Sequence, residues 1–101
     1  MTSKIKFLAV ARRWFDKVYG NTYHSVRVTR CRDGKIIAHE LTYGYGDQYR
    51  QTALGIMHRA GWLPKKYTEE SMYSFERENG YPIDWNVTDG LKRDAIANGE
   101  I

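Results

Sequence analysis

The sequence predicts one α+β domain, in which a three-stranded antiparallel sheet (a meander) is packed by one amphipathic helix and followed by a smaller, partly helical C-terminal segment. Apolar residues alternate with polar ones from Ile5 to Thr42, which is typical of half-buried strands, and they recur at helical spacing over residues 47–60. Asp33-Gly34, a pair typical of tight hairpins, stands between the second and third strand-like runs. The 101 residues are 42% hydrophobic, which is enough for a single core. We expect the sheet and main helix in residues 1–63 and the extension in residues 64–101.

The strand-like runs also predict how the sheet is arranged. Residues 5–14 carry apolar side chains on both faces, so we expect this strand to be central. The runs 22–32 and 35–43 are expected to pair through a type I′ turn at Asp33-Gly34. The expected register places Arg32 opposite Lys35, Arg30 opposite Ile37, Val28 opposite His39, Val26 opposite Leu41 and Arg27 opposite Glu40.

The main helix is expected over residues 47–60, with Asp47 as its cap and with Gly61 and Pro64 ending it. Its predicted apolar stripe consists of Tyr49, Ala53, Ile56, Met57 and Ala60.

Shorter elements are expected in the C-terminal segment. A short helix over residues 68–79 should turn Met72, Phe75 and Glu76 inward, and residues 83–87 form a short extended stretch. A last helix is expected to open at Thr88 or Asp89 and to close at Gly99.

Charge is unevenly distributed along the chain, whose formal net charge is +4. Residues 1–66 hold thirteen Lys and Arg against four acids, whereas residues 67–101 hold three against eight. A concentrated positive field attracts phosphate backbones or acidic protein faces. The alternative is that both regions are solvated surface.

Catalytic and metal-binding patterns are weak in this sequence. Cys31 lies between Arg30 and Arg32, which favour a reactive thiolate, but no orienting base stands at a recognisable spacing. The three histidines show no ligand spacing. We therefore expect no catalytic residue, no metal site and no cofactor. The single cysteine and the lack of a signal-peptide or membrane-span pattern favour the cytoplasm of a cell over a membrane.

Interleaved basic and aromatic residues are the strongest functional signal. They suit phosphate contacts with base stacking, and they equally suit a protein–protein hot spot, so both alternatives stay open. Arg59, Trp62, Lys65 and Lys66 repeat the pattern after the main helix. Tyr43-Gly44-Tyr45-Gly46 adds a glycine-rich backbone that could present N–H groups to an anion. The candidate binding residues are Arg12, Arg13, Trp14, Tyr23, Arg27, Arg30, Arg32, Lys35, Tyr43, Tyr45 and Arg50.

Five segments of the chain, at residues 12–17, 20–27, 43–49, 80–83 and 89–94, resemble small accessory proteins encoded by bacteriophages and prophages. No catalytic or binding residues are assigned to that group, so the resemblance implies context only. Such proteins commonly bind and redirect or block host machinery, including defence systems.

We therefore expect a non-enzymatic protein that binds a host protein or a nucleoprotein complex and inhibits a host defence system. The alternative is a protein that binds nucleic acid directly through a basic and aromatic face. The sequence leaves the oligomeric state open.

Overall fold

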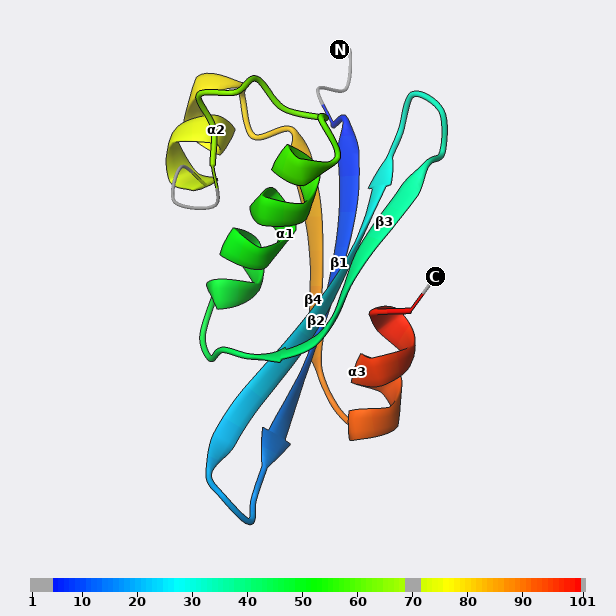
Figure 1. Cartoon of the computed structure of the whole chain (residues 1–101), viewed down its shortest axis with the longest axis vertical. Coiled ribbons are helices and arrows are strands. Elements are labelled where there is room, and N and C mark those ends of the chain that lie inside the picture. The colour runs from blue at the N-terminus through cyan, green and yellow to red at the C-terminus, as the bar shows by residue number, and fades with distance from the viewer. Residues whose placement is uncertain (1–4, 69–71, 101) are drawn as a thin grey trace.

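The computed structural model describes residues 5–68 and 72–100, without the side chain of Met72. In this part of the chain a four-stranded sheet lies between three helices, with α1 and α2 on one face and α3 on the other (Figure 1). The elements are β1 (Phe7–Asp16), β2 (Asn21–Arg30), β3 (Ile36–Tyr43), α1 (Gln48–Arg59), α2 (Met72–Glu78), β4 (Ile83–Asp89) and α3 (Lys92–Asn98). The predicted α+β class is confirmed. No helix among the described residues is long and apolar enough to cross a membrane.

A fourth strand extends the predicted meander and makes the sheet mixed. The strand order is β3-β2-β1-β4, and β4 pairs with β1 in parallel, with Phe7 opposite Ile83. The prediction that β1 is central is confirmed, because β1 is covered by strands on both edges. The prediction of three strands is wrong. Residues 83–87 were expected to be extended, but their partner lies more than seventy residues away and no local pattern indicates it.

The register of the β2–β3 hairpin differs by two residues from the predicted one. Val28 lies opposite Ile37 instead of His39, and Arg27 lies opposite Ala38 instead of Glu40. The Asp33 carboxylate accepts hydrogen bonds from the Arg30 guanidinium and from the backbone N–H of Lys35, which lengthens the connection to a four-residue turn. The hydrogen bonds of the Asp33 side chain therefore favour this four-residue turn over the predicted two-residue type I′ turn.

Helix α1 packs its buried side chains onto the core face of the sheet. Ala9, Ala11, Val26 and Val28 form this face, and all are at most 1% exposed. The predicted stripe is confirmed for Tyr49, Ala53, Ile56 and Met57, and it also contains Leu54 and Gly55, whereas Ala60 is exposed.

The start of α1 is not capped as predicted, because the Asp47 side chain makes no capping hydrogen bond. Its carboxylate instead accepts from the Tyr73 hydroxyl of α2. The Gln48 side chain binds the loop before the helix instead, because its oxygen accepts a hydrogen bond from the backbone N–H of Tyr45 at 3.0 Å.

The two C-terminal helices, α2 and α3, lie on opposite faces of the sheet (Figure 1). Phe75 and Glu76 of α2 are buried, as predicted, while residues 69–71 and the Met72 side chain lie outside the described residues. The last helix begins at Lys92, three residues after Asp89. It is fixed to the sheet because the Ser25 hydroxyl donates to the Ala95 carbonyl and the Asn98 amide donates to the Val10 carbonyl at 3.0 Å.

Candidate functional site

Seven of the eleven candidate binding residues lie at two opposite ends of an elongated molecule, whose longest extent is 45 Å. The β1–β2 turn lies at one end, and the β2–β3 turn lies at the other, beside the C-terminal end of α1 (Figure 1). The single basic and aromatic face expected from the sequence is therefore two surfaces, which we call the aromatic end and the basic end.

Three aromatic side chains form a row across the strands near the β1–β2 turn. Trp14 lies opposite Tyr23, with ring centroids 5.6 Å apart, and Tyr23 lies opposite Tyr43, with centroids 5.8 Å apart. The ammonium group of Lys92 in α3 lies 5.0 Å from the Trp14 ring. The pairing of three adjacent strands thus brings together three of the predicted binding residues.

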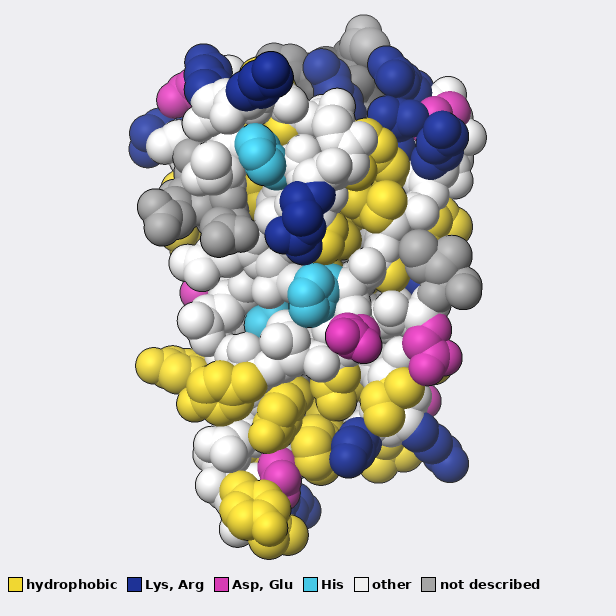
Figure 2. All heavy atoms as spheres, viewed as in Figure 1, with side chains coloured by type: hydrophobic (Ala, Val, Ile, Leu, Met, Phe, Trp, Pro, Cys, Tyr) yellow, Lys and Arg dark blue, Asp and Glu magenta, His cyan; other side chains and the backbone are white. Residues whose placement is uncertain are grey.

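Other large apolar side chains around the β1–β2 turn are exposed to solvent. Val18 is 82% exposed, Tyr19 is 78% exposed, and Phe15 and Tyr45 are also more than half exposed. Yellow side chains gather at this end of the molecule (Figure 2). The aromatic end comprises Trp14, Phe15, Val18, Tyr19, Tyr23, Tyr43 and Tyr45. Sequence reasoning missed Phe15, Val18 and Tyr19, although a Val-Tyr pair directly before a Gly-Asn turn was a usable signal.

The β1–β2 turn holds its apolar side chains in place through polar contacts of its own backbone. The Asp16 carboxylate accepts from the backbone N–H of Val18 at 2.9 Å, and the Asp16 carbonyl accepts from the N–H of Gly20 at 2.7 Å. Gly20 adopts a φ of 71°, which glycine tolerates without strain. The turn therefore presents Val18 and Tyr19 to solvent in a defined conformation.

The backbone of the Tyr43-Gly44-Tyr45-Gly46 loop makes hydrogen bonds that stabilise the fold. The N–H of Gly44 donates to the Thr22 carbonyl, and the N–H of Tyr45 donates to Gln48. A side chain at position 44 would come within 2.7 Å of the His24 ring, so only glycine fits there. The N–H groups of Gly44 and Tyr45 are thus already used, whereas the side chains of Tyr43 and Tyr45 are exposed.

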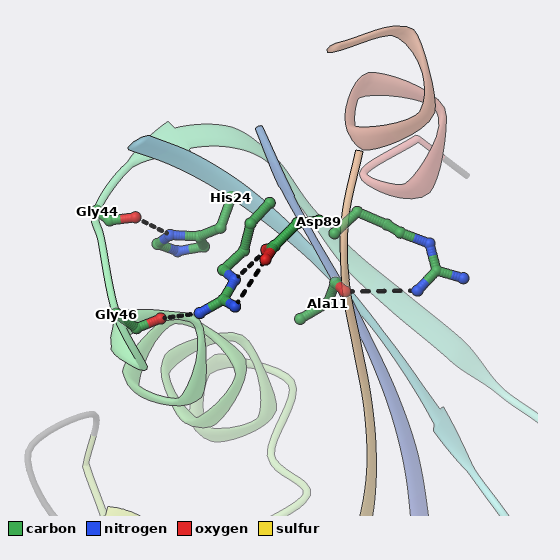
Figure 3. A network of polar contacts seen from close by, with 7 residues as sticks. Ala11, His24, Gly44, Gly46 and Asp89 are labelled. Atoms are coloured by element: carbon green, nitrogen blue, oxygen red, sulfur yellow. Dashed lines mark hydrogen bonds and ion pairs between the residues drawn. The ribbon is translucent and has the colours of Figure 1, made fainter. Parts of the chain in front are cut away.

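Buried His24 ties this loop to helix α1. Its Nδ1–H donates to the Gly44 carbonyl at 3.0 Å (Figure 3), so Nε2 accepts from the Thr52 hydroxyl at 2.7 Å. Burial lowers the pKa of His24 below its usual 6.5, the Gly44 carbonyl opposes this shift, and repulsion from His39 adds to it. His24 is therefore a neutral structural residue.

Several of the predicted binding arginines make hydrogen bonds with other parts of the chain. Arg13 binds both Asp89 carboxylate oxygens, at 2.6 and 3.2 Å, and also donates to the Gly46 carbonyl (Figure 3). Arg27 donates to the Asn98 carbonyl at 3.2 Å. Arg12 donates to the Asn86 side chain at 3.1 Å. These three arginines connect β1 and β2 to β4 and α3.

Arg50 is more deeply integrated than the other three. Its guanidinium donates to Glu76 at 3.1 Å, lies 5.0 Å from the Trp85 ring, and so links α1, α2 and β4. The same Glu76 carboxylate accepts from the Trp85 indole N–H at 2.6 Å. We leave Arg50 out of both surfaces because its hydrogen-bonding groups are used in the fold.

Most of the remaining positive charge gathers at the basic end. Figure 2 shows Lys and Arg side chains concentrated at the end of the molecule opposite the aromatic end. Asp33 lies among them, and its hydrogen bonds with Arg30 lower its pKa to about 2. The basic end comprises Lys6, Arg30, Arg32, Lys35, Arg59, Lys65 and Lys66. Sequence reasoning missed Lys6, which joins this end because its carbonyl accepts from the N–H of Cys31 at 2.9 Å.

No family model, curated protein or solved structure gives a significant match to this chain. Among residues 5–68 and 72–100, no three His, Cys, Asp or Glu side chains are grouped so that they could hold a metal ion. The candidate functional surfaces are the aromatic end and the basic end.

Proposed function

We propose that this protein is a non-enzymatic, phage-type accessory protein that binds a host protein through its aromatic end and thereby inhibits a host defence system. The observation that carries the proposal is the exposure of several large apolar side chains at one end, on a turn that its own hydrogen bonds hold. Soluble proteins rarely expose contiguous apolar groups of this kind unless a partner covers them.

The composition of the aromatic end favours a protein as the partner. Trp and Tyr dominate protein–protein hot spots, because they bury a large area while losing little side-chain entropy. The aromatic end has five such rings besides Phe15 and Val18, and the row from Trp14 to Tyr43 is already ordered by strand pairing. Binding would therefore cost little additional ordering.

The biological setting of the proposal comes from the resemblance to phage and prophage accessory proteins. That resemblance includes Trp14, Phe15 and Tyr43 within its segments. A host protein with an apolar pocket is the partner that suits both the resemblance and this surface. Self-association of two aromatic ends is the competing occupant.

The test is capture of host proteins from a bacterial lysate by the tagged protein and by two matched variants. Tyr19→Ser removes an exposed ring at the aromatic end, and Tyr81→Ser removes a ring of similar exposure elsewhere. We expect a captured protein that survives Tyr81→Ser and is lost with Tyr19→Ser. Equal capture by both variants would contradict the proposal. A concentration-dependent dimer that Tyr19→Ser abolishes would assign the aromatic end to self-association instead.

A further inference from the structure

A hollow of about 590 Å³ opens in the basic end, between the β2–β3 turn and the loop after α1. Lys6, Arg30, Arg32 and Trp62 line it. We infer that this hollow binds single-stranded nucleic acid, with a base against the Trp62 ring and backbone phosphates on Lys6 and Arg32. The inference concerns the end opposite the proposed protein-binding surface and does not depend on it.

The local structure fixes Trp62 at the wall of the hollow. Gly61 adopts a φ of 75° and ends α1, and the N–H of Trp62 then donates to the Met57 carbonyl at 3.0 Å. The Trp62 ring stacks on Phe7, with centroids 5.9 Å apart and planes 15° apart, and the Arg30 guanidinium lies 4.7 Å from the ring. Because Trp62 is only half-buried, part of its ring is left open to a ligand.

The charges around the hollow favour an anionic ligand. Arg30 is bound by Asp33 in two hydrogen bonds, and Lys66 lies 3.6 Å from Glu78, so these two cations are partly neutralised. Lys6, Arg32 and Lys35 are exposed on either side of the turn and keep the field positive. Exposed cations spaced along a groove are what a phosphate backbone requires.

The shape of the hollow favours a single strand over a duplex. Its volume lies within the range of small-ligand pockets, roughly 300–1,000 Å³, so it suits one unstacked nucleotide. A duplex would keep its bases stacked away from Trp62. A purely acidic polypeptide such as polyglutamate would use the cations but carries no ring to place against Trp62.

The first measurement is the fluorescence anisotropy of a labelled single-stranded oligonucleotide at several salt concentrations. We expect binding at low salt that weakens steeply as salt rises, because each bound phosphate releases counterions. Replacing both Lys6 and Arg32 with Ala should weaken binding roughly tenfold or more at low salt and should lower the salt slope by about 1.4. Lys17→Ala, a matched charge removal at the aromatic end, should change neither quantity.

The second measurement uses Cys31, the only cysteine of the chain, which is exposed and lines the hollow. Bound oligonucleotide should slow alkylation of Cys31 in the wild-type protein and not in the Lys6→Ala/Arg32→Ala variant. The inference is overturned by undetectable binding at low salt, by equal weakening with Lys17→Ala, or by binding that leaves Cys31 alkylation unchanged. Equally tight binding of a duplex or of polyglutamate would overturn it in favour of a different ligand.

Discussion

Glu76 shows how single residues assemble the distant parts of this fold. One carboxylate oxygen accepts from Arg50 at 3.1 Å and the other from the Trp85 indole at 2.6 Å, although Glu76 is only 4% exposed. A burial pattern in the sequence indicates that a glutamate turns inward but does not name its partners. For the same reason, the sequence could not distinguish the arginines that bind Asp89 and Glu76 from those free to contact a ligand.

We expect Glu76→Ala to destabilise the protein by about 3 kcal/mol, since it leaves the Trp85 indole N–H and the Arg50 guanidinium without their acceptor. Urea denaturation measures this loss. Asp84→Ala, which removes an exposed carboxylate from β4, is the control and should cost much less. Comparable losses in the two variants would show that the buried network contributes little.

His24 predicts how stability depends on pH. Because burial lowers its pKa, the folded state binds fewer protons than the unfolded state below the ordinary value of 6.5. Stability from this residue is therefore greatest above about pH 6.5 and falls as the pH drops below that value. The neighbouring charged groups are Arg13, which lies opposite His24 on β1, and His39.

Urea midpoints measured across this pH range should fall less steeply in His24→Gln than in the wild-type protein. Gln51→Ala, a control on the exposed side of α1 that removes no titrating group, should keep the wild-type dependence. An identical pH dependence in His24→Gln and the wild-type protein would show that His24 is not the titrating group.

Helix α1 is the element that the sequence predicts best. Its observed bounds differ from the prediction by one residue at each end, and four of the five predicted stripe positions are buried. The signal is local, because helical periodicity and the Gly61 and Pro64 stop signals lie within the segment itself. The prediction of the β2–β3 register was wrong because a side-chain hydrogen bond sets the turn. The pairing of β4 was missed because its partner strand is distant in the sequence.

Substitutions in α1 test this assignment directly. Met57→Ala should lower the free energy of unfolding by about 2–5 kcal/mol, because it opens a cavity against the sheet at a position that is fully buried. Gln51→Ala, on the exposed side of the same helix, should change stability little. Denaturant unfolding distinguishes them, and a similar loss in both would mean that the buried face is assigned incorrectly.

At the scale of the whole molecule, the sequence predicts most of the candidate binding residues but not their division between two ends. Trp14, Tyr23 and Tyr43 do meet, and Arg30 and Arg32 line one hollow, but the two groups lie at opposite ends of a 45 Å molecule. Strand direction decides this, because the β1–β2 and β2–β3 turns lie at opposite ends of β2. The two ends can therefore engage two components of one nucleoprotein partner, or two partners, without competing.

The most direct test of this account is capture from a host lysate, with and without nuclease, by four forms of the protein. These are the wild type, Tyr19→Ser, Lys6→Ala/Arg32→Ala and the combined variant. We predict that Tyr19→Ser loses the captured protein whether or not nuclease is present. The Lys6→Ala/Arg32→Ala variant should lose only nuclease-sensitive material. Loss of the nuclease-resistant protein with the basic-end variant, and its retention with Tyr19→Ser, would contradict the account.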